Sequence, residues 1–166
     1  MSKLESVDIF GVRVDRVNTD AALAIMEGYI RDGSPHMVVT ADSSCVVMAQ
    51  DDTELREIVC GADLVTPDGT GLLWAARRFG TPLDERVSGC DIVNHLCDRG
   101  AKAGYSVFLL GSAPGVAEEA GEKLKDMHPG LRIAGTQHGF FDSTESDEIV
   151  KRIAQLKPDM LFVALG

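Results

Sequence analysis

Short apolar runs that alternate with longer helical stretches are the feature that most constrains the fold of this 166-residue chain. The runs have the length of buried strands, whereas the segments between them repeat apolar residues at helical spacing. They cover residues 36–40, 62–66, 105–110, 131–136 and 160–165. Strands and helices in this order favour an α/β fold, a Rossmann-like layered domain in which helices flank a mainly parallel sheet.

Local signals predict further elements. Residues 7–15 alternate around a central glycine, which predicts a short N-terminal β element. Asn18 or Thr19 can cap a helix that Gly33 would end, and another helix is expected after Ser146. The length of the chain favours a single domain, residues 1–166, with one sizeable core.

Composition excludes several classes of protein. The net charge is -10, so the chain lacks the clustered Lys and Arg that bind nucleic acid or an anionic membrane surface. No apolar run reaches the roughly 18 residues of a membrane-spanning helix, and the first residues lack the apolar core of a signal peptide. We therefore expect a cytoplasmic protein.

The cysteines and histidines show no metal-binding spacing, because no C-x-x-C or H-x-x-x-H pair occurs. We expect reduced, buried or half-buried thiols and no metal site. The residues concerned are Cys45, Cys60, Cys90, Cys97, His36, His95, His128 and His138.

The turns that follow the strands are the first place to look for a site, because ligands bind at the carboxyl ends of parallel strands. In the turn from Thr66 to Gly71, Asp68 would stand at this edge, and its local sequence fits a catalytic carboxylate and a helix cap equally well. The same turn carries Gly69-x-Gly71, the start of a dinucleotide fingerprint, but Trp74 replaces its third glycine. As evidence for NAD this motif is weak.

Three other turns leave alternatives open. The turn that contains Thr40 and Asp42 has residue types that capping alone would explain. The turn from Gly111 to Gly115 can bind a phosphate at a helix start, or it can simply be a turn between a strand and the next helix. Arg86, just before a helix that follows Ser88, can offset a diphosphate charge or pair with a neighbouring acid, Asp84 or Glu85.

Taken together, these motifs resemble the WecG/TagA/CpsF family of bacterial glycosyltransferases in order and spacing. The resemblance covers nearly the whole chain and is specific as a combination. The stretches that carry it are residues 38–42, 62–71, 85–89, 108–111, 135–141 and 161–166.

The resemblance implies an enzyme that needs no cofactor. In the family's TagA branch, N-acetylmannosamine passes from UDP to undecaprenyl-diphosphate-linked N-acetylglucosamine, in wall teichoic acid or related surface polysaccharide synthesis. The family pattern implies Asp68 as catalytic base and Thr40, Asp42, Arg86, Gly69 and Thr70 as substrate-binding residues. For the nucleotide we expect Gly111, Ser112, Gly139 and Phe140.

The chain departs from the family pattern at two places. Asp42 stands where the family has Asn, and an ionised carboxylate accepts but does not donate a hydrogen bond. The chain stops at Gly166, before the segment and the membrane-docking basic tail of similar members. We therefore expect a fragment truncated at its C-terminus, with weak activity or none, from an enzyme peripheral to the inner face of the cell membrane.

The mechanism expected is a single displacement with inversion at the donor's anomeric carbon. No Asp-x-Asp motif occurs, so the expectation is metal independence, with helix N-termini and Arg86 opposite the UDP leaving group. The alternatives are an NAD-dependent oxidoreductase built on Gly69-x-Gly71 and a nucleotide-binding module without catalysis. Self-association is left open.

Overall fold

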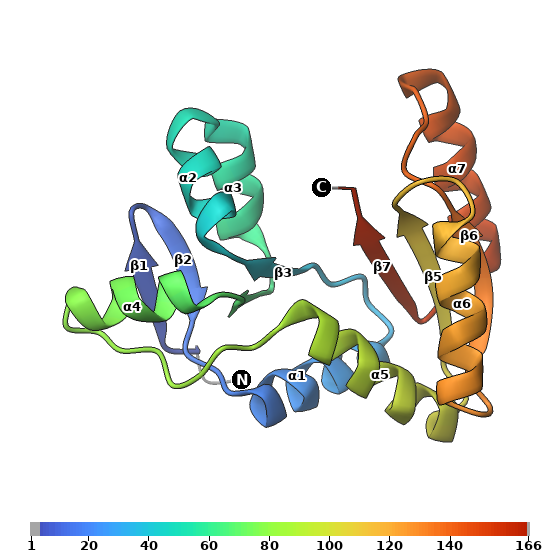
Figure 1. The fold of residues 1–166 in the computed structure, drawn as a ribbon, viewed down its shortest axis with the longest axis horizontal. Coiled ribbons are helices and arrows are strands. Elements are labelled where there is room, and N and C mark those ends of the chain that lie inside the picture. Colours follow the sequence, from blue (N-terminus) through green and yellow to red (C-terminus); the bar gives the residue numbers. More distant parts are fainter. Residues whose placement is uncertain (1–3, 166) are drawn as a thin grey trace. The chain divides into compact units, whose positions relative to one another are not determined.

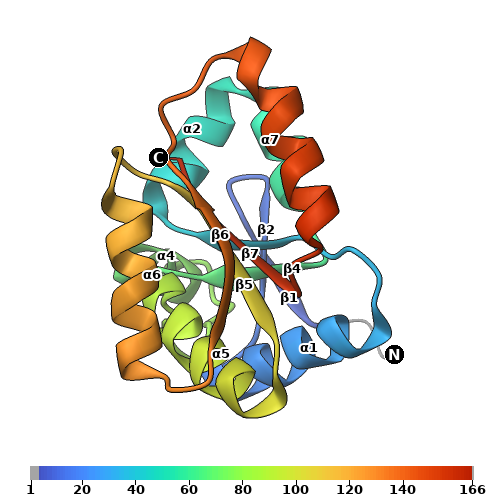
Figure 2. The same ribbon diagram turned by 90° about the vertical axis from the view of Figure 1, so that its right-hand side faces the viewer.

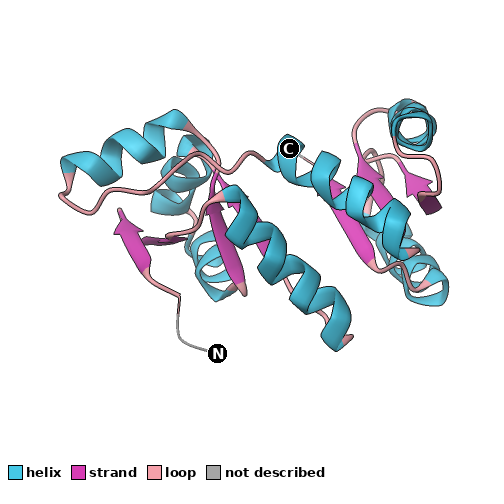
Figure 3. Cartoon of the chain, turned by 90° about the horizontal axis from the view of Figure 1, so that it is seen from below, coloured by secondary structure: helices cyan, strands magenta, loops and turns pink. Residues whose placement is uncertain are grey.

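The computed structural model describes residues 4–165, and the chain divides into two compact units, Met1–Ile92 and Val93–Gly166. Figure 1 shows the elements in chain order, and Figure 3 shows strands and helices alternating along the chain.

The first unit begins with a β-hairpin. Strands β1 (Ser6–Ile9) and β2 (Val12–Asp15) pair antiparallel, and the two-residue turn Phe10-Gly11 has φ values of 53° and 82°. Two positive φ angles match the right-handed twist of the flanking strands, and the glycine adopts one of them without strain. The alternating apolar residues of both strands are buried, so the predicted N-terminal β element is confirmed.

Two parallel strands, β3 (Val38–Ala41) and β4 (Leu64–Pro67), form the sheet that carries the carboxyl-end turns of this unit. Their register places Thr40 opposite Thr66 and Ala41 opposite Pro67, so both strands end at the same level. The Asp15 carboxylate, 2% exposed, accepts a hydrogen bond of 2.8 Å from the Val65 amide. This bond attaches the end of the hairpin to β4.

The helices of the first unit begin and end at residues with clear local causes. Helix α1 (Thr19–Asp32) is capped by the Asn18 side chain, and Gly33 ends it with φ 73°. Helices α2 (Ser43–Asp51), α3 (Thr53–Gly61) and α4 (Thr70–Arg78) pack on the core that includes the hairpin and β4. Helix α5 (Gly89–Ala103) starts in this unit and continues into the next.

The second unit is a three-stranded parallel sheet between helices. Strand β5 (Ser106–Gly111) lies between β6 (Arg132–Gln137) and β7 (Met160–Ala164). Helices α6 (Val116–Met127) and α7 (Ser143–Leu156) lie on opposite faces of this sheet (Figure 2).

Two glycines mark the close packing of these helices on the sheet. A Cβ atom on Gly121 of α6 would lie 3.7 Å from the Leu109 side chain. On the other face, a Cβ atom on Gly135 of β6 would lie 2.7 Å from the Phe108 ring and 3.3 Å from Leu156 of α7. Successive residues of β5 therefore pack on opposite faces, as the strand pleat requires.

The fold class predicted from the sequence is confirmed, and each of the five apolar runs overlaps a strand. The strands form two parallel sheets of two and three strands in the described chain. One boundary was wrong: α7 is capped by Asp142, four residues before Ser146, because Asp142 and Glu145 form a reciprocal capping box. Among the described residues, no helix is long and apolar enough to cross a membrane.

Candidate active site at the carboxyl ends of β3 and β4

Asp68 lies directly after β4 and is held by backbone groups from two directions. Its amide donates to the Ala41 carbonyl (2.7 Å), and its carboxylate oxygen Oδ2 accepts from the Gly89 amide (2.9 Å). The Pro67 carbonyl also accepts from the Val87 amide (2.8 Å). These bonds join the ends of both strands to the loop that leads into α5.

The structure shows that Asp68 is not the side-chain cap of α4. A cap of α4 would place the carboxylate on the first amides of that helix, but the N-cap position is Gly69 and no side chain caps the helix. The carboxylate is half-buried and turned to Gly89 at the start of α5. Its second oxygen, Oδ1, has no hydrogen-bond partner among residues 4–165, and is thus available to accept a proton.

Thr40 is brought to the same place by the strand register. It is exposed near the end of β3, next to the glycine that holds Asp68. A Cβ atom placed on Gly89 would lie 3.2 Å from Thr40 Oγ1 and 3.4 Å from Asp68 Oδ2. The hydroxyl, the carboxylate and the glycine therefore form one cluster.

Asp42 has a structural role in this unit. Its side chain caps α2 by accepting a hydrogen bond of 2.8 Å from the Cys45 amide. A Cβ atom on Gly69 would lie 3.8 Å from Asp42 Cβ, so Asp42 stands beside the turn that follows Asp68. Asp is one of the preferred N-cap residues, so this cap explains an Asp at position 42.

The start of α4 is open to a ligand in two respects. Gly69 has φ 149° and ψ 140°, Thr70 is exposed, and the first turn of the helix contains no acidic residue. Gly71 packs against the Ser43 side chain at the start of α2, where a Cβ atom would overlap Ser43 Oγ. Helix amides without a side-chain cap, in a first turn that carries no acid, favour an anion.

Arg86 is exposed and forms no ion pair or hydrogen bond among the described residues. The two acids that could have paired with it have other partners. Asp84 pairs with Arg16 at 3.3 Å, and Glu85 accepts a hydrogen bond of 2.5 Å from the Thr19 amide. Hydrogen bonds from the Thr19 hydroxyl and amide also lower the pKa of Glu85. The guanidinium of Arg86 is thus left free for a ligand.

The residues predicted to bind the nucleotide lie in the second unit. Ser112 donates its amide to the Ala164 carbonyl (3.0 Å) and accepts from the Gly139 amide (2.8 Å). Gly111, with φ 139°, lies against the backbone of Ala164, where a Cβ atom would overlap the carbonyl. The next residue after Gly139, Phe140, is 73% exposed. Three of the four residues therefore meet at the carboxyl ends of the three strands.

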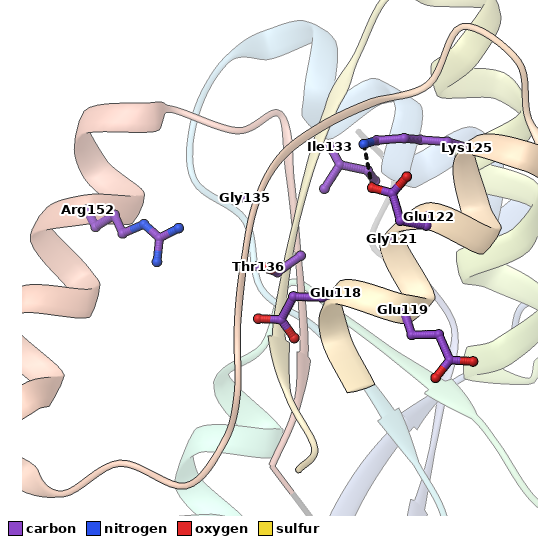
Figure 4. Close-up of a pocket in the computed structure, with 9 residues that line it drawn as sticks. All are labelled: Glu118, Glu119, Gly121, Glu122, Lys125, Ile133, Gly135, Thr136 and Arg152. Carbon is purple, nitrogen blue, oxygen red and sulfur yellow. Dashed lines mark hydrogen bonds and ion pairs between the residues drawn. The ribbon is translucent and has the colours of Figure 1, made fainter. Parts of the chain in front are cut away.

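A hollow of about 380 Å³ in the second unit contains none of the predicted site residues (Figure 4). It lies along β6, between α6 and α7, and Glu118, Glu119 and Glu122 line one side of it. Lys125 pairs with Glu122 (2.8 Å), and the Arg152 guanidinium lies 5.7 Å from the centre of the Phe108 ring. A wall of carboxylates disfavours a diphosphate, and we do not place the active site there.

Metal-binding residues are not clustered in the part of the chain that the structure describes: no group of three His, Cys, Asp or Glu side chains could hold an ion. All four cysteines are free. Burial raises the pKa of Cys97 to about 11, so this thiol is inert. Cys90 is exposed, unlike the buried or half-buried state predicted for the cysteines, because it lies on the solvent side of the first turn of α5.

The sequence profile of the glycosyl transferase WecG/TagA/CpsF family matches residues 7–166. This chain belongs to that family. It is 32% identical over 138 residues to the N-acetylglucosaminyldiphosphoundecaprenol N-acetyl-beta-D-mannosaminyltransferase of Bacillus spizizenii, covering 83% of this chain and 53% of that protein. It is 30% identical over 167 residues to the Staphylococcus aureus protein of the same name, covering 99% of this chain and 65% of that protein.

The chain thus spans between half and two thirds of the length of these WecG/TagA/CpsF relatives. The family match runs through both compact units, so it includes every site residue predicted from the sequence. Gly89, whose amide holds Asp68, was not predicted from the sequence. The sequence does contain a hint: Gly89 is the first residue of α5, a position where no turn requires a glycine.

Proposed function

We propose that the protein is an inverting, metal-independent glycosyltransferase that uses a UDP-sugar. The sugar is N-acetylmannosamine or a relative of it, and the acceptor is undecaprenyl-diphosphate-linked N-acetylglucosamine. The names of the relatives give N-acetylmannosamine as the sugar they transfer and this molecule as their acceptor. The observation that carries the proposal is a carboxylate, Asp68, fixed through one oxygen and open at the other.

The proposed mechanism uses Asp68 as general base. As the acceptor hydroxyl attacks the anomeric carbon of the donor, its proton passes to Asp68 Oδ1, and the bond from that carbon to the UDP oxygen breaks. A positioned base contributes about 10²–10⁴-fold to such a step. The attack and the departure occur on opposite faces of the sugar, which inverts the anomeric configuration.

The leaving group is a diphosphate, and two features of the first unit favour its negative charge. One is the start of α4, where no side chain caps the amides of Gly69 and Thr70 and the first turn of the helix carries no acid. The other is Arg86, whose guanidinium is exposed and unpaired among the described residues. These groups support the proposal of metal independence. Thr40, beside Asp68, is proposed to hold the sugar or the acceptor hydroxyl, and Asp42 is proposed as a further substrate contact.

The second unit is proposed to bind the nucleotide. The Ser112 hydroxyl is exposed, and the Phe140 ring offers an exposed face for a base. Gly111 and Gly139 permit the close packing that shapes this edge. We also propose that residues 1–166 belong to one glycosyltransferase domain, since the family match crosses both units, and that it acts at the inner membrane surface where a lipid-linked acceptor resides.

The test is an assay of UDP release by the full-length protein that carries this sequence. UDP-N-acetylmannosamine is supplied with a lipid-diphosphate-linked N-acetylglucosamine, with and without EDTA. Release of UDP that requires the acceptor and persists in EDTA is expected. Saturable binding of NADH with no binding of UDP would instead favour an oxidoreductase, and loss of activity in EDTA with recovery on adding Mg²⁺ or Mn²⁺ would contradict metal independence.

A further inference from the structure

A side chain at Gly89 would press on the candidate site. Gly89 is the first residue of α5 and is half-buried. A Cβ atom there would lie 3.2 Å from Thr40 Oγ1, 3.3 Å from Thr40 Cγ2 and 3.4 Å from Asp68 Oδ2. The first two distances are shorter than ordinary van der Waals contact, so a methyl group would push on the site.

The backbone conformation gives no other reason for glycine at this position. Gly89 is not among the described glycines with positive φ, so an L-amino acid could adopt its backbone angles. Glycine in a helix is less favourable than alanine by up to about 1 kcal/mol. The space is therefore the feature that requires glycine, because it lets the start of α5 approach Asp68 closely enough to donate a hydrogen bond.

That hydrogen bond determines which carboxylate oxygen is free. The Gly89 amide donates to Oδ2 at 2.9 Å, while the Asp68 amide is already fixed to the Ala41 carbonyl. The Val87 amide, two residues before Gly89, holds the approach of the loop by its bond to the Pro67 carbonyl. Asp68 is thus anchored at its backbone and at Oδ2, so its remaining oxygen keeps one direction.

We propose that Gly89 is a positioning residue for the catalytic base: its amide orients Asp68, and its lack of a side chain keeps that amide and Thr40 in place. This inference rests on the proposed function, in which Asp68 accepts the proton of the attacking hydroxyl. In this proposal Gly89 acts only through Asp68. Its effect on the rate passes through the direction of Oδ1.

The experiment is Gly89→Ala in the full-length protein, with steady-state kinetics of UDP release. The added methyl group would press on Thr40, so the start of α5 and its amide should shift relative to Asp68. We therefore expect kcat to fall about 10-fold or more while the donor KM stays within about twofold. The matched control is Gly28→Ala in α1, where a Cβ atom would meet nothing within 4 Å, and it should keep both constants. Equal kinetics of Gly89→Ala and Gly28→Ala would overturn the proposal.

A double-mutant cycle separates positioning from a general structural effect. With Asp68→Asn already in place there is no base left to orient, so adding Gly89→Ala should lower the residual rate by much less than it does in the wild type. A further loss of the same factor would overturn the proposal. Thr40→Ser removes the methyl group nearest the new Cβ, so it should restore part of the rate of Gly89→Ala relative to Thr40→Ser alone.

A measurement that needs no substitution at Gly89 completes the test. Amide hydrogen exchange at Gly89 should be faster in Asp68→Ala than in the wild type, because the acceptor of its hydrogen bond is gone. Unchanged exchange would overturn the proposal even where Gly89→Ala does not fold. An Asp68→Asn enzyme as active as the wild type would instead contradict the proposed base, and so the proposed function itself.

Discussion

The turn after β4 and the turn after β5 look alike in the sequence, since each places glycines between a strand and a helix without a side-chain cap. Their surroundings differ. The first turn contains Asp68, whose Oδ1 is open, and α4 has no acid in its first turn. In the second turn the backbone of Ser112 is bonded on both sides, and Glu118 and Glu119 stand in the first turn of α6.

The difference shows that a glycine turn at the carboxyl end of a strand serves two physical purposes. Around Asp68, glycine allows other backbone segments to approach a functional carboxylate. At Gly111, it allows β5 and β7 to close on each other, while the acids of α6 already complement the helix dipole. We therefore expect substitution of Asp68 to change catalysis and substitution of Gly111 to change stability.

The largest effect on stability is expected for Gly111→Ala. The new Cβ atom would overlap the Ala164 carbonyl and lie 2.9 Å from Ala164 Cα, at a φ of 139° that alanine rarely adopts. The unfolding free energy should fall by more than about 3 kcal/mol, measured by chemical denaturation. Gly69→Ala is the matched control, because its φ is 149° but its nearest neighbour is 3.8 Å away. Equal losses of unfolding free energy in the two variants would contradict the expected difference between the two turns.

Much of the fold could be predicted because its causes are local. Apolar runs located the strands, and the cap at Asn18 and the glycine at Gly33 located α1. The division of the five strands into two sheets could not be predicted, because apolar runs carry no information on which strands pair. The start of α7 was misplaced because Ser146 and Asp142 are both good caps, and only the reciprocal bond with Glu145 decides between them.

The site could be predicted only in part. The position of Asp68 at the strand edge followed from the order of the elements, and Thr40 came beside it through the register of β3 and β4. The contact between Asp68 and Gly89 spans 21 residues, and no local pattern encodes it. Similarly, the neighbours of Arg86 were reasonable partners in sequence, but Arg16 and the start of α1 bind them instead.

Arg86→Ala should weaken donor binding without affecting stability. Loss of a charged hydrogen bond costs about 1.5–3 kcal/mol, so the donor KM should rise about 10-fold to 100-fold. The melting temperature should stay unchanged, because Arg86 is exposed and unpaired among the described residues. Arg78→Ala, which removes an exposed charge from the last turn of α4, is the control and should keep the donor KM. A KM that rises equally in both variants would show only a net-charge effect.

The smallest effect is expected at the other end of β3 and β4, where His36 lies 3.0 Å from Asp32 and 3.3 Å from Asp63. Burial alone would lower the pKa of His36, but the hydrogen bonds and charges of the two carboxylates outweigh it and raise the pKa. A hydrogen bond from the Ser34 amide, together with one from His36, lowers the pKa of Asp32. A hydrogen bond from the Met37 amide, together with one from His36, lowers the pKa of Asp63.

The sign of the pH dependence follows from these directions. The raised pKa of His36 gives stability that is complete below about pH 6.5 and is lost as the pH rises through the folded value. The lowered pKa values of the carboxylates give stability that is present above about pH 3.9 and is lost as the pH falls. Stability from this cluster should peak between these limits. Melting curves of His36→Gln against the wild type should differ more at about pH 5.5 than at about pH 8.5, whereas equal differences would contradict the account.

The central claim is that Asp68 is the base of a glycosyl transfer, and the most direct measurement is the rate of UDP release by Asp68→Asn. Asparagine keeps the size and an oxygen for the Gly89 amide but accepts no proton, so kcat should fall about 10²–10⁴-fold with the fold and UDP binding retained. A rate equal to that of the wild type would contradict the claim.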